Sequence, residues 1–253
     1  MFKREAFENK KFFITGASSG IGRELAIFLS KLGAFVCISG RDKNRLKKTF
    51  EMLSGKEHKW YSSDLSTSDD VSELMKNVYS DFGQLDGLIH CAGVQHTLPL
   101  QMISEDTFDK IFRINTLSAF LLSKEFRKKG RYNPDGSSIV FLSSAAAISG
   151  ESGISEYSAS KLALVGISRS LASELSRQKI RVNCIAPGVV KTEMTNKFLN
   201  SLTPEQFSQI EGRHLLGLGE VNDVLGSIAF LLSDSAKWIT GINLSVDGGY
   251  TLG

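Results

Sequence analysis

The feature that most limits the fold of this chain is a regular alternation of short β-rich runs with longer helical stretches. The β-rich runs lie near Lys11–Thr15, Ala34–Ser39, Lys59–Ser62, Leu85–His90, Ser138–Leu142, Arg181–Ala186 and Asn243–Val246. Between them, apolar residues recur at helical spacing near Ile21–Leu32, Arg45–Leu53, Asp69–Asp81, Glu105–Lys129, Glu156–Arg177 and Val221–Leu232. This alternation is typical of βαβ units. It predicts an α/β fold in which seven parallel strands form a sheet covered by helices on both faces.

The length of 253 residues is compatible with one domain, since single α/β domains of about 200–250 residues are common. We therefore expect residues 1–253 to form a single dinucleotide-binding and catalytic domain. Residues 191–218 differ from the rest because they follow a strand and lack a strand pattern, but are rich in large apolar side chains. This segment is predicted to be a lid over the substrate, the alternative being a pair of short helices packed on the body.

Charge and cysteine content exclude several kinds of protein. Thirty Lys and Arg against 27 Asp and Glu give a net charge of +3, which does not favour nucleic acid or an anionic membrane as a partner. No apolar run approaches the ~18 residues of a membrane span, and the N-terminus lacks the apolar stretch of a signal peptide. Three cysteines lie within or beside apolar runs, which indicates reduced thiols and a cytoplasmic protein. The four histidines show no ligand spacing, so we expect no bound metal.

A glycine-rich turn, TGASSGIG, follows the first predicted strand and leads into a helix, with glycines at positions 16, 20 and 22. Glycines allow the backbone to approach a phosphate closely, and a helix N-terminus supplies free N–H groups and a favourable dipole. The spacing is G-x-x-x-G-x-G rather than the commoner G-x-G-x-x-G. Its position in the first βαβ unit favours a dinucleotide as ligand.

The second predicted strand ends in SGRD, at the position that normally meets the adenosine ribose. An acidic residue at the strand tip would bind the ribose 2′-hydroxyl, but Gly40 stands there and Arg41 follows. This favours a 2′-phosphate and hence NADP(H). NAD(H) is the alternative, because Asp42 would contact the ribose if the strand ended one residue later.

The segment SSAAAISGESGISEYSASK, residues 143–161, carries the candidate catalytic residues. Tyr157 and Lys161 are four residues apart on a predicted helix, so their side chains share one face. A neighbouring cation lowers the pKa of a phenol, which would allow Tyr157 to act as general acid or base. Ser144, after the preceding strand, would donate a hydrogen bond to an oxygen on which charge develops.

Eight motifs occur in an order and spacing that resemble those of the short-chain dehydrogenase/reductases. They are TGASSGIG, Asp64 in SSDLS, the pair Ala92–Gly93, Asn115 in FRINT, Ser144, YSASK, APGVVKT (186–192) and VDGG (246–249). The resemblance extends from about Lys10 to the C-terminus. It implies a Rossmann fold with strand order 3-2-1-4-5-6-7 and hydride transfer between nicotinamide and a carbonyl or alcohol carbon.

By the same resemblance, Ser144 orients the substrate oxygen, Tyr157 exchanges a proton with it, and Lys161 lowers the pKa of the tyrosine and binds the nicotinamide ribose. Asn115 would support a water in the proton relay. The residues expected to contact the cofactor are Gly16, Ser18, Ser19, Gly20, Ile21, Gly22, Arg41, Asp64, Leu65, Ala92, Gly93, Tyr157, Lys161, Pro187, Gly188, Val190 and Thr192. Family members commonly pair the helices near Glu105–Lys129 and Glu156–Arg177, which implies a homotetramer or homodimer.

The chain departs from the family where Asn-Asn-Ala-Gly is usual, since it has His90-Cys91-Ala92-Gly93. The asparagines tie neighbouring strands together, so this departure concerns local geometry more than the catalytic set. His90 is predicted to be a strand-end or core histidine.

A small carbonyl or alcohol compound is the expected substrate. Its predicted neighbours are Val94, Gln95, His96, Ala146, Ile148, Glu151, Val189, Met194 and Phe198. The stretch KTEMT and the C-terminus resemble family members that reduce 3-oxoacyl groups on an acyl carrier protein. In those proteins a basic docking position falls at what is Gln178 here, although Arg177 and Lys179 are adjacent. The alternatives are an NAD-dependent dehydrogenase of alcohols, sugars or steroid-like rings, and a dinucleotide-binding regulator without catalysis.

Overall fold

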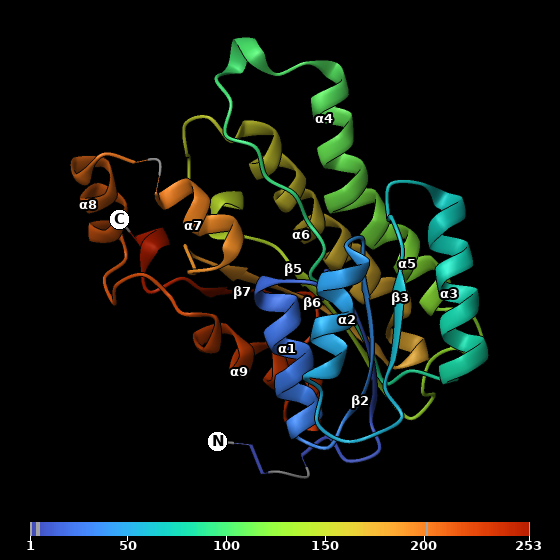
Figure 1. The fold of residues 1–253 in the computed structure, drawn as a ribbon. Coiled ribbons are helices and arrows are strands. Elements are labelled where there is room, and N and C mark those ends of the chain that lie inside the picture. The colour runs from blue at the N-terminus through green and yellow to red at the C-terminus, as the bar shows by residue number, and fades with distance from the viewer. Residues whose placement is uncertain (1, 4–5, 201, 253) are drawn as a thin grey trace.

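In the computed structural model, which describes residues 2–3, 6–200 and 202–252, seven strands form one parallel sheet (Figure 1). The strands follow the order β3-β2-β1-β4-β5-β6-β7, with every neighbouring pair parallel. Their bounds are β1 Lys11–Thr15, β2 Phe35–Gly40, β3 Lys59–Ser62, β4 Gly87–His90, β5 Ser137–Leu142, β6 Ile180–Pro187 and β7 Asn243–Val246. The predicted fold class and strand order are confirmed.

Helices cover both faces of the sheet, as predicted (Figure 1). Successive side chains of β1 point to opposite faces, so Ile14 packs into one core and Phe13 into the other. The Ile14 side is covered by α1 (Gly20–Lys31), α2 (Lys43–Glu51) and α9 (Val221–Leu232). The Phe13 side is covered by α3 (Ser68–Phe82), α5 (Ser118–Phe126) and α6 (Ser155–Leu175).

The helix predicted over Glu105–Lys129 contains a wider turn at its centre. It consists of α4 (Glu105–Phe112), a π-helical turn at Arg113–Leu117 and α5 (Ser118–Phe126). Apolar periodicity predicts where a helix lies, but a change from an i→i+4 to an i→i+5 hydrogen-bond pattern leaves no such signal in the sequence. The helix is therefore present close to its predicted bounds, and only its central turn was not predicted.

The predicted lid segment forms two short helices, α7 (Glu193–Leu199) and α8 (Pro204–Arg213), drawn in orange in Figure 1. Thr203 caps α8, accepting a hydrogen bond from the Gln206 N–H while the Gln206 side chain accepts from the Thr203 N–H. The segment packs against the C-terminal end of the chain, where the Leu216 N–H donates to the Gly248 carbonyl oxygen at 3.0 Å. The alternative arrangement, a pair of helices packed on the body, is present, and a lid role stays a prediction.

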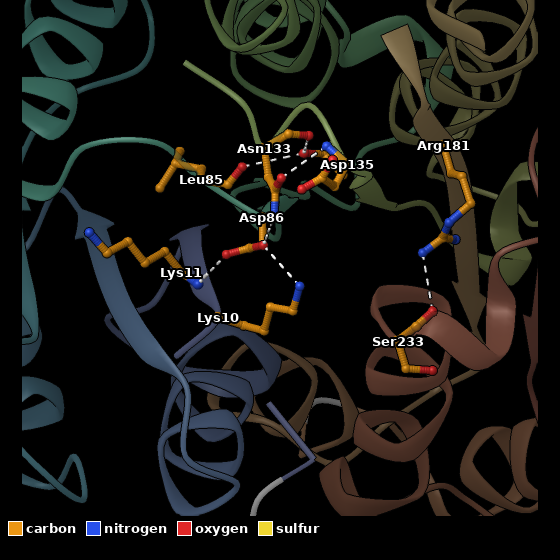
Figure 2. Close-up of polar contacts among 9 residues, drawn as sticks. Lys10, Lys11, Leu85, Asp86, Asn133, Asp135, Arg181 and Ser233 are labelled. Atoms are coloured by element: carbon orange, nitrogen blue, oxygen red, sulfur yellow. Dashed lines mark hydrogen bonds and ion pairs between the residues drawn. The ribbon is translucent and has the colours of Figure 1, made fainter. Parts of the chain in front are cut away.

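The amino ends of the strands are joined by a polar cluster around Asp86 (Figure 2). Its carboxylate accepts hydrogen bonds from the Lys11 N–H at 2.8 Å, the Asn133 amide at 2.8 Å and Lys10 Nζ at 3.2 Å. Nearby, Leu85 pairs with the loop at Tyr132 instead of extending β4, which therefore begins at Gly87. The loop expected at 127–137 is thus fixed to the body at this edge of the sheet.

Within the described residues, none of the helices has the length and apolarity that crossing a bilayer requires. The same residues contain no group of three or more His, Cys, Asp or Glu side chains placed to hold a metal ion.

Candidate active site

The carboxyl end of β5 and the first turns of α6 bring the expected catalytic side chains together. Ser143, directly after β5, donates through Oγ to the Lys161 carbonyl oxygen at 2.9 Å and ties the strand to the helix. Ser144 caps a short 3-10 helix (Ala145–Ala147), its Oγ accepting from the Ala146 N–H at 3.1 Å. The Ser144 side chain lies close enough to Tyr157 to influence the pKa of its phenol. The serine and the phenol can therefore meet the same substrate oxygen.

Burial of the Tyr157 hydroxyl raises its pKa, while the neighbouring Ser144 side chain opposes that rise. Lys161 follows one turn later, as predicted, with Nζ 5.8 Å from the centre of the Tyr157 ring. In the structure, Lys161 Nζ donates to the Leu142 carbonyl oxygen at 2.7 Å. The expected lowering of the tyrosine pKa by Lys161 stays a prediction.

Lys161 is itself buried, and burial lowers the pKa of its ammonium to about 8. It lies against Gly93, where a Cβ would be 3.2 Å from Lys161 Nζ and 3.3 Å from Asn115 Oδ1. A side chain at position 93 would press on both polar groups. Glycine at this position therefore keeps the lysine and the asparagine close to the loop that follows β4.

Asn115 lies in the π-helical turn and does not line the cavity of the site. Its side-chain oxygen accepts from the Val94 N–H at 2.8 Å, and its amide nitrogen donates to the Val94 carbonyl oxygen and to Ser160 Oγ, both at 3.0 Å. Its side chain thus fixes the loop after β4 and the helix that carries Tyr157. A role in supporting a relay water stays a prediction.

The glycine-rich turn after β1 is built for close backbone approach. Gly16 has a φ of +68°, and a Cβ there would lie 2.6 Å from the Ala92 nitrogen. A Cβ on Gly22 would lie 2.5 Å from the Gly16 carbonyl oxygen. Only glycine fits at both positions, so no side chain separates the backbone of the turn from the start of α1. This cradle and the free N–H groups of the helix fit the phosphates of a dinucleotide.

A carboxylate from the lid segment lies at this helix start. Glu193 Oε2 accepts from the Gly20 N–H at 3.1 Å, and its Oε1 pairs with Arg23 Nη1 at 2.8 Å. Burial favours the neutral acid, but the Arg23 charge and the N–H bonds hold the pKa of Glu193 below its ordinary value. The anionic side chain therefore occupies the kind of position that suits a phosphate, a contact that the sequence analysis did not anticipate.

Two arginines lie near the carboxyl end of β2, Arg41 directly after the strand and Arg45 in the first turn of α2. Gly40 is the last strand residue and Arg41 follows, as predicted. Asp42 caps α2, accepting from the Arg45 N–H at 2.9 Å and pairing with Arg45 Nε at 2.8 Å, and these contacts lower its pKa. Arg45 faces the same cavity as Arg41 and was missed, although its spacing of three residues from a capping aspartate signals this contact.

These groups line one cavity of about 1060 Å³ that runs from the end of β2 to the C-terminal segment. Every residue expected to contact the cofactor faces it, as does Ser144. Residues that line it and were not anticipated include Arg45, Cys91, Thr97, Ile114, Ser152, Ile154, Glu193, Thr195, Ile210 and Tyr250. Most are apolar or come from the lid segment and the C-terminus, which only the fold brings to this point.

The structure places most of the expected substrate neighbours at the cavity, and their contact with a substrate stays a prediction. Val94, Gln95, Ala146, Glu151, Val189 and Met194 line the cavity, whereas His96 and Ile148 do not. His96 lies in the loop before α4, and Ile148 is half exposed at the end of a short 3-10 helix. The side chain of Phe198, expected here as well, lies outside the part of the chain that the structure describes.

The substrate end of the cavity is closed by contacts among three segments. Glu151 accepts hydrogen bonds from Arg213 Nη1 at 2.5 Å and from the Tyr250 hydroxyl. Arg213 lies over the Tyr250 ring at 4.3 Å, and the His214 ring stacks on the same tyrosine at 4.5 Å. Burial and the bond to Glu151 raise the pKa of Tyr250 to about 12. This cluster joins the loop after β5, the end of α8 and the C-terminal end.

The expected carrier-docking residues lie far from the site. Gln178 and Arg177 belong to a 3-10 turn at Ser176–Gln178, which precedes β6, whereas Tyr157 stands at the other end of α6. The helix has 21 residues, about 30 Å at the usual rise per residue. In one chain, these residues and the cavity therefore lie at opposite edges of the sheet.

Comparison with known proteins identifies the family. A family model described as enoyl-(acyl carrier protein) reductase matches residues 16–251. A 3-oxoacyl-[acyl-carrier-protein] reductase from Rickettsia felis is 38% identical over 242 residues, which are 95% of this chain and 96% of the relative.

Solved structures agree with this match. A short-chain type dehydrogenase/reductase from Mycobacterium ulcerans superposes with a TM-score of 0.87 at 28% identity, over 98% of this chain and 91% of the other. A 4-hydroxyisoleucine dehydrogenase complexed with NADH gives a TM-score of 0.88 at 31% identity, over 97% of this chain and 100% of the other. The chain therefore belongs to the short-chain dehydrogenase/reductase family and is an oxidoreductase that uses a nicotinamide dinucleotide to act on CH–OH or C=O groups.

Proposed function

We propose that the chain is a cytoplasmic, NADP(H)-dependent reductase of 3-oxoacyl thioesters, with acyl-carrier-protein-linked groups as its leading substrate class. The observation that carries this proposal is the single cavity that joins two arginines at the end of β2 to Ser144 and Tyr157 and then to a partly apolar substrate end. The name of the Rickettsia felis relative supports the same substrate class. In this proposal residues 1–253 work as one domain, and residues 191–218 close over the substrate.

The side chains divide the work of carbonyl reduction. When bound, the nicotinamide dinucleotide supplies the hydride. The Tyr157 hydroxyl donates a proton to the carbonyl oxygen as charge develops there, and its raised pKa keeps it protonated at neutral pH. The Ser144 hydroxyl donates a hydrogen bond to the same oxygen. The Lys161 ammonium, one helical turn away, favours the negative charge left on the phenol.

The preference for NADP(H) follows from the charges at the end of β2. Arg41 and Arg45 face the cavity, and a guanidinium makes strong charge-assisted bonds with a phosphate. Asp42, the ribose ligand of the alternative reading, is engaged in capping α2 and pairing with Arg45. NAD(H) remains the second candidate, because Asp42 also borders the cavity.

Dissociation constants for NADPH and NADH test this preference. Charge-assisted bonds contribute about 1.5–3 kcal/mol, so Arg41→Ala is expected to weaken NADPH binding roughly ten- to a hundredfold and to leave NADH nearly unchanged. Gly40→Asp is expected to reverse the preference, since a carboxylate there repels the 2′-phosphate. A Cβ at Gly40 would lie 3.1 Å from Ser18 Cβ, so Gly40→Ala is the steric control. Equal weakening of both cofactors by Arg41→Ala would make Asp42 the ribose ligand.

The substrate class is tested by turnover with a panel of carbonyl compounds. NADPH consumption is measured with 3-oxoacyl thioesters of a small carrier and of an acyl carrier protein, and with sugar, steroid-like and short-chain ketones. The highest kcat/KM is expected for the 3-oxoacyl thioesters. A higher kcat/KM for a sugar or a ring ketone would make that class, and not the 3-oxoacyl thioesters, the proposed substrate. Absence of turnover with every compound in both directions would favour the alternative that the protein is a dinucleotide-binding regulator without catalysis.

We infer that the protein forms a homodimer or homotetramer through α4, α5 and α6. Phe108, Leu117, Phe120 and Leu162 on these elements are 39% to 50% exposed, an unusual amount of large apolar side chain on neighbouring helices. A second copy of the chain is the occupant that the family resemblance implies. Light scattering at low micromolar concentration is expected to give a multiple of 27.7 kDa, and a mass of one chain would contradict the inference.

A further inference from the structure

His90, the last residue of β4, stands where the family usually has an asparagine, and it is completely buried. Its imidazole lies between β1 and the π-helical turn of Arg113–Leu117. Nδ1 is 3.0 Å from Thr15 Oγ1, and Nε2 is 3.2 Å from Ser118 Oγ. The ring therefore joins the centre of the sheet to the helix that carries Asn115.

The neighbouring groups allow one protonation state of this ring. The Ser118 hydroxyl donates its hydrogen to the Ile114 carbonyl oxygen at 2.6 Å, so it can only accept from His90. Nε2 must then carry the proton, and Nδ1 must accept from the Thr15 hydroxyl. Burial, together with the charge of Lys161, lowers the pKa of His90 to about 3, which keeps the ring neutral. The Thr15 oxygen in turn accepts from the Ala92 N–H at 3.3 Å.

The bond to Ser118 acts at the point where the helix departs from α geometry. The Ser118 N–H donates to the Arg113 carbonyl oxygen, five residues back, so the Ile114 carbonyl oxygen takes the Ser118 hydroxyl instead. The same hydroxyl lies 3.2 Å from His90 Nε2. A side chain from the neighbouring strand therefore contacts the wide turn.

The same turn presents Asn115, whose side chain holds both polar groups of the Val94 backbone and bonds Ser160. Ser160 Oγ also donates to the Tyr157 carbonyl oxygen at 2.7 Å. A shift of the turn would therefore move the loop at Ala92–Val94 and the first turns of α6 together. These two segments border the places expected for nicotinamide and substrate.

We propose that His90 is a positioning residue, which holds the π-helical turn through its Nε2–H···Ser118 bond and so aligns Asn115, the Val94 loop and Tyr157. The imidazole reaches further than the usual asparagine and makes a contact that asparagine is too short to make. The readout by turnover rests on the proposed carbonyl reduction. A second readout does not need activity.

Two replacements of His90 separate its two hydrogen bonds. In His90→Gln, the amide nitrogen reaches the position of Nε2 and preserves the donor to Ser118. In His90→Asn, the amide ends near Nδ1 and preserves only the contact with Thr15. Ser118→Ala removes the same bond from its other partner.

The expected results distinguish positioning from packing. His90→Asn and Ser118→Ala should lower kcat roughly tenfold, the size of a typical coupling within one hydrogen-bond network, and the double variant should be no worse than either. NADPH affinity should change less than twofold, and His90→Gln should keep kcat near the parent value. Exchange of the Val94 amide hydrogen should be faster in His90→Asn and Ser118→Ala, but unchanged in His90→Gln.

Several results would overturn the proposal. If His90→Gln and His90→Asn lower the melting temperature equally and leave kcat and Val94 exchange unchanged, His90 only fills the core. If His90→Gln loses as much kcat as His90→Asn, the Ser118 bond is not the relevant one. If neither the parent nor any variant reduces a carbonyl compound, the proposed function fails, while Val94 exchange still decides the role of His90.

Discussion

The two edges of the parallel sheet use their polar groups in different ways. At the amino edge, Asp86 accepts three hydrogen bonds from fixed donors, and Arg181 donates to the Ser233 carbonyl oxygen at 3.3 Å (Figure 2). At the carboxyl edge, the half-buried Tyr157 and the buried Lys161 lie beside a large cavity and have displaced pKa values. The polar groups at the amino edge of the sheet thus make structural hydrogen bonds, whereas those at the carboxyl edge include the candidate catalytic groups. Stability and chemistry should respond to substitutions at different edges.

The largest expected effect is that of Tyr157→Phe at the carboxyl edge. The phenylalanine keeps the packing of the ring but has no transferable proton, so kcat should fall roughly 10²–10⁴-fold or beyond detection. NADPH binding, followed by fluorescence, and the melting temperature should stay close to the parent values. Activity within a few-fold of the parent would remove Tyr157 from the acid–base role.

Ser144→Ala is the next largest change at the same edge. Loss of a hydrogen-bond donor to the developing oxyanion should lower kcat by roughly 10²–10³. Ser143→Ala is the matched control, because that hydroxyl donates to the Lys161 carbonyl oxygen and not into the cavity. The idea fails if the two alanine variants lose the same amount of kcat.

Asp86→Ala probes the opposite edge. It removes the acceptor of three donors and leaves the Lys11 N–H unpaired, which should lower the free energy of unfolding by about 1–3 kcal/mol. The value of kcat at 25 °C should be that of the parent. Denaturant unfolding checks the first expectation, with Asp135→Ala, an exposed carboxylate in the loop that carries Asn133, as control. A loss of kcat without a loss of stability would break the contrast between the edges.

The smallest predicted effect is a dependence on pH. Because the pKa of Lys161 is about 8, its ammonium is lost above that pH, and kcat/KM for the cofactor should fall up to tenfold per pH unit. The pKa of Tyr157 is raised, so the phenol should not cause this decline. A decline that begins only near pH 10 would assign it to Tyr157 instead.

Stability should move in the opposite direction over the same range. The folded protein releases the Lys161 proton near pH 8, whereas the unfolded chain keeps it up to the ordinary value of 10.5. The unfolded state therefore binds more protons between these values, and the free energy of unfolding gains with rising pH. Comparison of the parent with Lys161→Met across this range isolates the contribution.

Most of the fold could be predicted from the sequence because strands and helices differ clearly in the periodicity of their apolar residues. Three strands, β1, β3 and β7, have the predicted bounds, and α9 does as well. Two features of the site depend only on residues close together in the sequence. The spacing of the glycines predicts one turn, and the spacing of Tyr157 and Lys161 predicts one face of a helix. Contacts between residues far apart in the sequence could not be predicted. Glu193 contacts Gly20, 173 residues away, and Glu151 contacts Tyr250, 99 residues away.

Other differences arise because hydrogen-bond partners are not encoded by residue type. The sequence does not predict that the Asn115 side chain binds the Val94 backbone, and its expected support of a relay water stays a prediction. Nor does it predict that Lys161 Nζ donates to the Leu142 carbonyl oxygen at the end of β5, and its expected action on the phenol stays a prediction. The same composition would allow either pairing, and the packing of α6 against β5 selects one.

Glu193 gives the site a competitor that belongs to the chain itself. An anion that binds at the start of α1 meets a carboxylate already bonded to the Gly20 N–H and to Arg23, and one N–H cannot serve both fully. A tethered competitor has a fixed effective concentration, typically in the millimolar range for a short flexible tether, and dilution does not weaken it. The observed affinity for a phosphate ligand is therefore set by the difference between the binding free energies of the phosphate and of the Glu193 carboxylate at this position. A phosphate bound at the start of α1 is therefore expected to displace Glu193 from the Gly20 N–H.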